Sequence, residues 1–250
     1  MKFQLLPVAD IMIALYQTPV SADRFTNYMK ILQGNAPGDI TMPVTFFNPM
    51  GKEHVLNRLK ELKDLKAEEH MKTILAYINR TITSFSSKEI TVSLALADDL
   101  GGGWTNRYTT DYDSKFNTND LLKRNFCNPL FWVSEAYSED LIKERTADYC
   151  YRVLYRSTAS QPLTLEDHLD QELFVARHNP FRTSDSHMEE LNKIDSFYKQ
   201  HKQTTQYPTI FNFLYGDDAS REIGHTAYGI KGAFPGFNYA NELARKSEKV

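Results

Sequence analysis

The distribution of glycine constrains this chain more than any other feature of its sequence. Three of the 11 glycines stand together as Gly101, Gly102 and Gly103, five more fall within residues 216–236, and none occurs in residues 104–215. Glycine interrupts regular structure because it adopts backbone conformations that other residues avoid. The long interval without glycine therefore favours helices, and each glycine cluster marks a turn or an irregular segment.

The best strand candidate directly precedes the first glycine cluster. Ile90, Val92, Leu94 and Leu96 alternate with smaller residues, which is the period of two that a strand requires. An Asp-Asp pair and the glycines then break the pattern, and we expect residues 104–110 to return as a second strand. The simplest interpretation is an antiparallel hairpin over residues 89–110.

Most other apolar residues recur at helical spacing. Such patterns cover residues 8–15, 25–32, 52–81, 139–157, 165–176, 188–198 and 238–246. Residues 52–81 form either one helix or two, and residues 208–215 form either a strand or a short helix.

Several polar side chains are expected to cap helices. The candidates are Ser21, Asn128, Ser138, Thr164 with Asp167, and Ser186 with Glu189. Together the patterns predict an α+β fold that is predominantly α-helical, with a small antiparallel element. We expect one compact domain over residues 1–250, with an irregular glycine-rich segment at 216–236.

The composition excludes only a few classes of protein. The chain is 41% hydrophobic with a formal net charge of -3, which gives no support for nucleic-acid binding and predicts an ordinary globular protein. No apolar run approaches the roughly 20 residues that span a bilayer, so no membrane association is expected. Cys127 and Cys150 belong to no metal or redox motif, and a cytoplasmic location is predicted.

The segment around the triple glycine is the first candidate site. Its backbone could approach a ligand closely, and nearby carboxylates could act as oxygen ligands of a divalent metal. The alternative is a solvated turn. The candidate ligand-binding residues here are Asp98, Asp99, Gly101, Gly102, Gly103 and Arg107, and the candidate metal ligands are Asp98, Asp111 and Asp113.

Two further candidates lie on predicted helices. Arg145, Arg152 and Arg156, with Tyr149 between them, recur on one face that could clamp a carboxylate or phosphate, unless it is a salt-bridged surface. His168 and Glu172 stand four residues apart, a spacing that would let both ligate one metal, although such a pair is more often a surface or capping contact.

No motif in the chain fixes a reaction. We therefore predict a ligand-binding or protein-interaction module, with a possible divalent metal as its cofactor. The alternative is a small-molecule enzyme that acts on a carboxylate- or phosphate-bearing substrate, with metal assistance. The oligomeric state stays open.

Overall fold

The computed structural model describes residues 1–35, 38–82, 88–100, 105–182 and 191–247. Contacts within the chain divide it into two units. The first contains Met1–Thr110 and Thr118–Cys150, and the second contains Asp111–Asn117 and Tyr151–Val250. The expectation of one domain over residues 1–250 stays a prediction, and each unit is described by itself.

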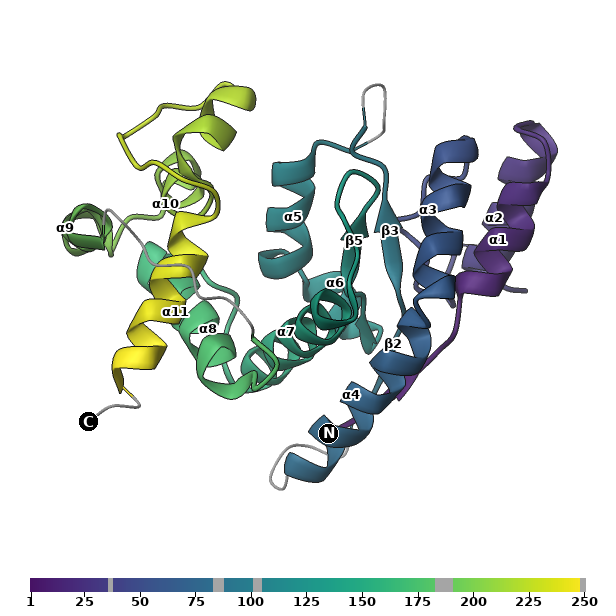
Figure 1. Cartoon of the computed structure of the whole chain (residues 1–250), viewed down its shortest axis with the longest axis horizontal. Coiled ribbons are helices and arrows are strands. Elements are labelled where there is room, and N and C mark those ends of the chain that lie inside the picture. Colours follow the sequence, from purple (N-terminus) through teal and green to yellow (C-terminus); the bar gives the residue numbers. More distant parts are fainter. Residues whose placement is uncertain (36–37, 83–87, 101–104, 183–190, 248–250) are drawn as a thin grey trace. The chain divides into compact units, whose positions relative to one another are not determined.

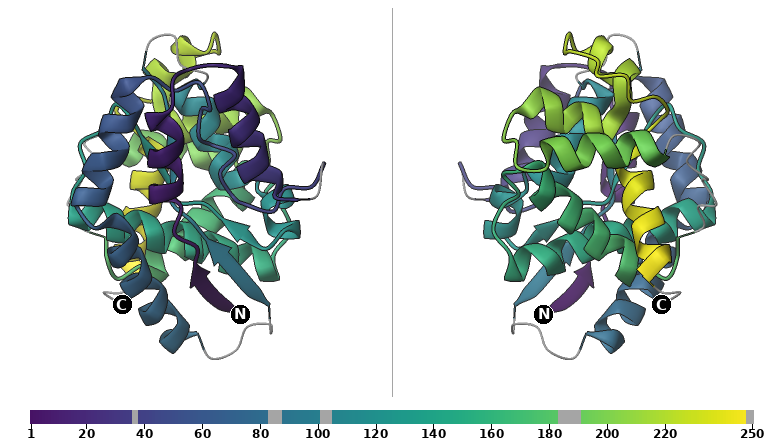
Figure 2. Two further views of the ribbon diagram at one scale, coloured as in Figure 1. Left: turned by 90° about the vertical axis from the view of Figure 1, so that its right-hand side faces the viewer. Right: turned by 90° about the vertical axis from the view of Figure 1, so that its left-hand side faces the viewer.

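The first unit is built on short parallel strands. β1 (Lys2–Leu5), β2 (Glu89–Val92) and β4 (Phe126–Cys127) pair in the order β1-β2-β4, and β3 (Ala95–Ala97) pairs with β5 (Leu130–Trp132). All pairs are parallel, and both views in Figure 2 show β1 and β2 side by side. The N–H groups of Ser93 and Ala95 donate to the carbonyls of Cys127 and Pro129. The segment that joins β2 to β3 therefore runs beside the segment that joins β4 to β5.

Asn128, which lies between β4 and β5, stabilises these two connecting segments. Its side-chain amide donates to the Ser93 hydroxyl and to the Pro43 carbonyl, each at 2.8 Å. The prediction that Asn128 caps a helix is wrong, because Pro129 leads directly into β5.

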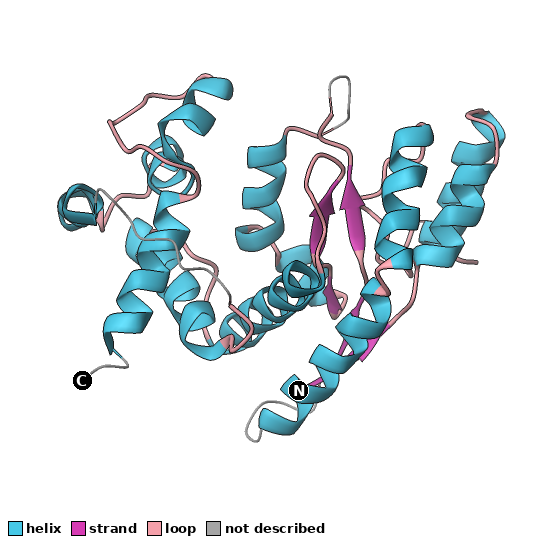
Figure 3. Cartoon of the chain, in the orientation of Figure 1, coloured by secondary structure: helices cyan, strands magenta, loops and turns pink. Residues whose placement is uncertain are grey.

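The predicted antiparallel hairpin over residues 89–110 is also wrong. After β3 the chain enters helix α5 (Arg107–Phe116), because the Asn106 side chain accepts the N–H groups of Tyr108 and Thr109 at 3.1 and 3.0 Å and caps that helix. β2 and β3 pair instead with strands that are distant in the sequence. Residues 94–97 are all buried, as expected for parallel strands that are covered on both faces. The prediction of a helix-rich chain with a small sheet is confirmed (Figure 3).

Helices pack around the strands of the first unit. They are α1 (Ala9–Gln17), α2 (Ala22–Gln33), α3 (Glu53–Asp64), α4 (Ala67–Thr81), α6 (Asn119–Lys123) and the first part of α7 (Glu139–Thr158). Figure 1 shows α3 and α4 on one side of the strands and α6 on the other. The pattern over residues 52–81 forms two helices, because Lys66 adopts a left-handed conformation with φ of 53°.

The second unit is helical in its described residues. Helices α8 (Leu165–His178), α9 (Leu191–His201), α10 (Tyr207–Glu222) and α11 (Pro235–Ser247) join the later residues of α5 and α7, and α11 packs against the other three. Residues 208–215 are thus helical. Thr164 and Asp167 form the predicted capping box, whereas Ser186 and Glu189 lie outside the described residues.

Helix α10 bends at Gly216, where φ is 84°, and then continues to Glu222. Only residues 223–234 of the predicted irregular segment at 216–236 therefore lack helix. Across the described ranges, no helix is long and apolar enough to cross a membrane.

Candidate functional site

Polar side chains gather where β3 and β5 end. Asp98 and Asp99 follow β3, while Ser134 and Glu135 follow β5 shortly after its last residue. Because the strands are parallel, these residues share one edge of the sheet, which is where open α/β sheets bind ligands. Asp99 links the two strand ends, since its carboxylate accepts the Ser134 N–H at 3.0 Å and the Ser134 hydroxyl at 2.6 Å.

Arginines surround the carboxylates at this edge. Arg107 donates to Asp99 at 3.0 Å and lies 3.7 Å from Glu135. Arg145 forms a two-pronged ion pair with Glu135, and Arg58 pairs with Glu61 while donating to the Glu135 carbonyl. The positive groups thus face nearby carboxylates, so the edge carries little net charge with which to attract an anion.

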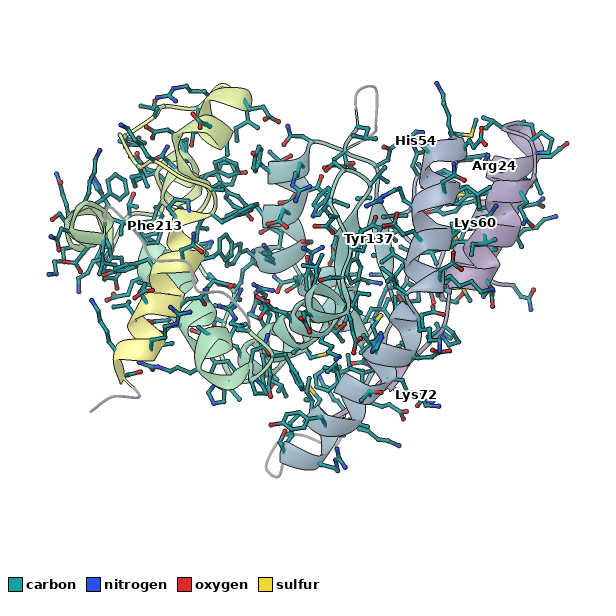
Figure 4. All side chains as sticks on the ribbon, in the orientation of Figure 1. Arg24, His54, Lys60, Lys72, Tyr137 and Phe213 are labelled. Atoms are coloured by element: carbon teal, nitrogen blue, oxygen red, sulfur yellow. The ribbon has the colours of Figure 1, made fainter. Side chains whose placement is uncertain are left out.

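Asp98 has a different partner, His54, which lies in the first turn of α3 (Figure 4). Nε2 of His54 is 3.1 and 3.0 Å from the two carboxylate oxygens of Asp98. A carboxylate oxygen accepts, so Nε2 carries the hydrogen. No described residue offers a partner to Nδ1, and the His54 side chain is 38% exposed. The basic nitrogen of this pair is therefore open to solvent or a ligand.

A cavity of about 290 Å³ lies beside Asp98. Aromatic rings form much of its wall, with Phe25 and Tyr28 contributed by α2 and Phe46 and Phe47 by the following connector. Among the described residues that line it, Asp98 is the only one with a charged side chain, and it is 5% exposed. This volume is close to the lower end of the range for ligand pockets, roughly 300 to 1,000 Å³, and is enough for a small organic molecule.

Buried polar contacts hold the wall of this cavity in place. Arg24 lies on α2, donates to the Gly51 carbonyl at 2.6 Å and stacks on the Tyr16 ring at 4.7 Å (Figure 4). The Tyr28 hydroxyl donates to the Val44 carbonyl at 3.0 Å. Burial raises the pKa of Tyr28 to about 12, so this hydroxyl stays protonated at neutral pH.

A second cavity of about 260 Å³ lies where α3 and α4 meet. Its charged lining residues are Asp10, Lys63, Lys66, Glu68, Glu69 and Lys72, and the acidic and basic groups balance. Glu68 accepts the N–H groups of Val8 and Ala9, which are the first donors of α1. This carboxylate has a structural role, and the three lysines are exposed to solvent.

The predicted arginine face is divided among separate partners. Arg145 and Tyr149 belong to the first unit, where Tyr149 is buried. In the second unit Arg152 pairs with Glu172, and Arg156 donates to the Phe116 carbonyl at 3.4 Å. Of the predicted loop residues, Asp98, Asp99 and Arg107 lie at the strand edge, whereas Gly101, Gly102 and Gly103 lie outside the described residues.

The predicted metal ligands have other partners. Both Glu172 oxygens accept from Arg152, at 2.8 and 2.6 Å. Nδ1 of His168 donates to the Thr164 carbonyl at 2.7 Å, and its Nε2 accepts from the Tyr112 hydroxyl at 2.8 Å. The Asp111 carboxylate accepts from Lys115 at 2.5 Å and from the Tyr215 hydroxyl at 2.8 Å, and Asp113 accepts from Asn117. No group of three or more His, Cys, Asp or Glu side chains that could hold a metal occurs in the described part of the chain.

Sequence reasoning identified Asp98 but missed its partner His54 and the aromatic residues that line the cavity. His54 lies 44 residues before Asp98, and no local spacing connects the two. The only available signals were the aromatic pair Phe46 and Phe47 in a connector rich in glycine and proline, and Phe25 and Tyr28 on one face of a short helix. Both patterns are equally typical of core packing.

Comparisons of this chain with protein-family models, with curated proteins and with solved structures found no match. The arrangement of the chain's own residues is therefore the basis for assigning a function.

Proposed function

We propose that the first unit binds a small molecule in the cavity beside Asp98. The observation that carries this proposal is a buried carboxylate that follows a parallel strand and lines an apolar cavity. Ligand sites in open α/β sheets lie beyond the carboxyl ends of the strands. They also combine apolar walls with a few converging polar groups, as this cavity does.

Three probes that share a benzyl or phenyl group and differ in charge test the proposal. They are benzyltrimethylammonium, benzyl alcohol and benzoate, and binding is measured by isothermal titration calorimetry. We expect at least one of them to bind with a stoichiometry of one. If none binds at millimolar concentration, the proposal is wrong.

A variant that fills the cavity tests the location. Met29 lines the cavity from α2, so Met29→Trp should abolish probe binding while the protein stays folded. Lys30→Trp places the same ring at the next, exposed position of the helix and should leave binding unchanged. Equal probe affinities in the two variants would show that the probe binds outside this cavity.

A small-molecule enzyme is the second candidate, and the His54–Asp98 pair favours it. A histidine that is held through Nε2 by a carboxylate presents Nδ1 as a general base. A hydrolytic reaction would use this base to activate water. The test is the hydrolysis of p-nitrophenyl acetate, which His54→Gln should reduce to the rate in buffer, and an unchanged rate would exclude this role.

The remaining expectations from the sequence stay predictions. They are a protein-interaction surface, an anionic ligand, a bound divalent metal, the absence of nucleic-acid binding and a cytoplasmic location. The anionic ligand has the least support, because Arg107 and Arg145 already face Asp99 and Glu135.

A further inference from the structure

We infer that the ligand of this cavity is an organic cation, namely a small molecule with an alkylammonium group. This inference rests on the proposed function and deepens it, since it names the class of ligand. Two independent features of the lining support it, one electrostatic and one aromatic.

The electrostatic feature is the single carboxylate in the described lining. Asp98 supplies the single formal charge among the described lining residues, and it is negative. Its oxygens accept from His54 and, at 3.3 Å, from the Leu100 N–H. A carboxylate has about four acceptor positions, so capacity remains for a ligand. At low exposure its field is less screened than that of a surface group, and a cation in the cavity benefits directly.

The aromatic feature is the ring content of the wall. Phe25, Tyr28, Phe46 and Phe47 all line the same cavity. The faces of aromatic rings carry partial negative charge and attract ammonium groups, which is how aromatic cages recognise quaternary ammonium ligands. An anion would meet both these rings and the Asp98 carboxylate, so the same lining disfavours it.

The neighbouring arginine does not cancel this preference. Arg24 is absent from the lining, and it is engaged by the Gly51 carbonyl and the Tyr16 ring. The described wall thus presents no lysine or arginine to a ligand. This distinguishes the cavity from the strand edge, where arginines and carboxylates alternate.

Calorimetric titration with the three probes tests the class of ligand. Benzyltrimethylammonium carries a permanent charge, so pH does not alter it. We expect it to bind about tenfold more tightly than benzyl alcohol, because the Asp98 charge and the aromatic ring faces both favour the cation, and benzoate not to bind. If the alcohol binds as tightly as the cation, or benzoate binds best, the inference is wrong while the proposed function stands. If no probe binds, the proposed function itself fails.

Two variants measure how much the Asp98 charge and the Phe25 ring each contribute to the preference for the cation. Asp98→Asn removes the charge at constant size and should reduce the preference for the cation over the alcohol to twofold or less. Phe25→Leu removes a ring at a position that is 42% exposed, so the fold should tolerate it. It should weaken cation binding about threefold and leave alcohol binding nearly unchanged. A cation preference that survives both substitutions would overturn the inference.

Discussion

Both carboxylate oxygens of Asp98 lie within hydrogen-bond distance of Nε2 of His54, at 3.1 and 3.0 Å. The contact joins the end of β3 to the first turn of α3, two elements that are far apart in the sequence. It fixes the orientation of Asp98, whose carboxylate lines the cavity, and it leaves Nδ1 of His54 available.

This relationship predicts how ligand binding responds to changes at His54. In His54→Gln the side-chain amide still donates to Asp98, so the affinity for benzyltrimethylammonium should stay within about twofold of the parent value. His54→Ala removes the donor and frees the carboxylate to rotate, and we expect a three- to tenfold loss, the usual range for one hydrogen bond. Titration calorimetry distinguishes the two. Equal affinities in the alanine variant and the parent would show that His54 does not orient Asp98.

The buried ion pair in the second unit gives a prediction about stability. Arg152 and Glu172 are 4% and 1% exposed and are joined by two hydrogen bonds. Glu172→Met or Arg152→Met removes one charge of the pair and leaves the other buried, so each should lower the free energy of unfolding by about 3–5 kcal/mol. Urea denaturation measures this loss.

The double variant Arg152→Met with Glu172→Met is the matched control. It removes both charges and leaves similar volumes, so it should be more stable than either single variant. If the losses of the single variants simply add in the double variant, the two side chains are not energetically coupled.

The bend in α10 predicts a strict requirement for glycine at position 216. A Cβ atom there would approach the Gly232 carbonyl oxygen to 2.5 Å, and φ is 84°. We expect Gly216→Ala to cost more than about 2 kcal/mol, because it combines a steric clash with an unfavourable backbone conformation.

Gly224→Ala separates the clash from the backbone effect. Gly224 also has a positive φ, of 75°, yet a Cβ atom there meets nothing within 4 Å. This variant should cost about 1 kcal/mol. Equal losses of stability in the two variants, by thermal or urea unfolding, would contradict the role of the close approach to Gly232.

His168 makes the stability of the second unit depend on pH. Burial lowers the pKa of this imidazole below its ordinary value of 6.5, although its hydrogen bond to the Thr164 carbonyl opposes the shift. The unfolded chain therefore binds a proton at a higher pH than the folded chain does. The stabilising effect of the neutral ring is complete above pH 6.5 and is lost as the pH falls through the folded pKa. Over that range the free energy of unfolding falls by no more than about 1.4 kcal/mol per pH unit.

Urea denaturation at pH 7.5 and pH 5.5 tests this sign. The parent protein should lose more stability at the lower pH than a variant that combines His168→Phe with Tyr112→Phe, which removes the imidazole together with its hydroxyl partner. If the pH dependence of the two proteins is the same, His168 is not the titrating group.

The fold could be predicted from the sequence only where the signals are local. The capping box of Thr164 and Asp167, the amphipathic stripe of residues 139–157 and the terminal helix all have nearby sequence signatures, and each is present. The alternation of residues 90–96 indicated a strand correctly, but pairing depends on distant residues. β1 shows no sign of being the partner of β2, because four residues carry too little pattern.

The site was also predictable only in part, because only some of its signals are local in the sequence. The Asp-Asp pair after a strand candidate drew attention to Asp98 and Asp99, and both lie at the strand edge. The charge pattern of α7 did not reveal that Arg145 and Arg152 each face a buried or half-buried carboxylate from another element. Which carboxylate neutralises which arginine is a property of the three-dimensional arrangement.

The most direct test of the central claim is an NMR titration of the methionine methyl groups, labelled with ¹³C, with benzyltrimethylammonium. The chain has seven methionines, and Met29 lines the cavity beside Asp98. Met29→Leu identifies its signal. We predict that the Met29 methyl signal shifts most and saturates with the calorimetric affinity, and that Asp98→Asn weakens this response. A Met29 signal that stays in place while the probe binds would contradict the assignment of this cavity as the ligand site.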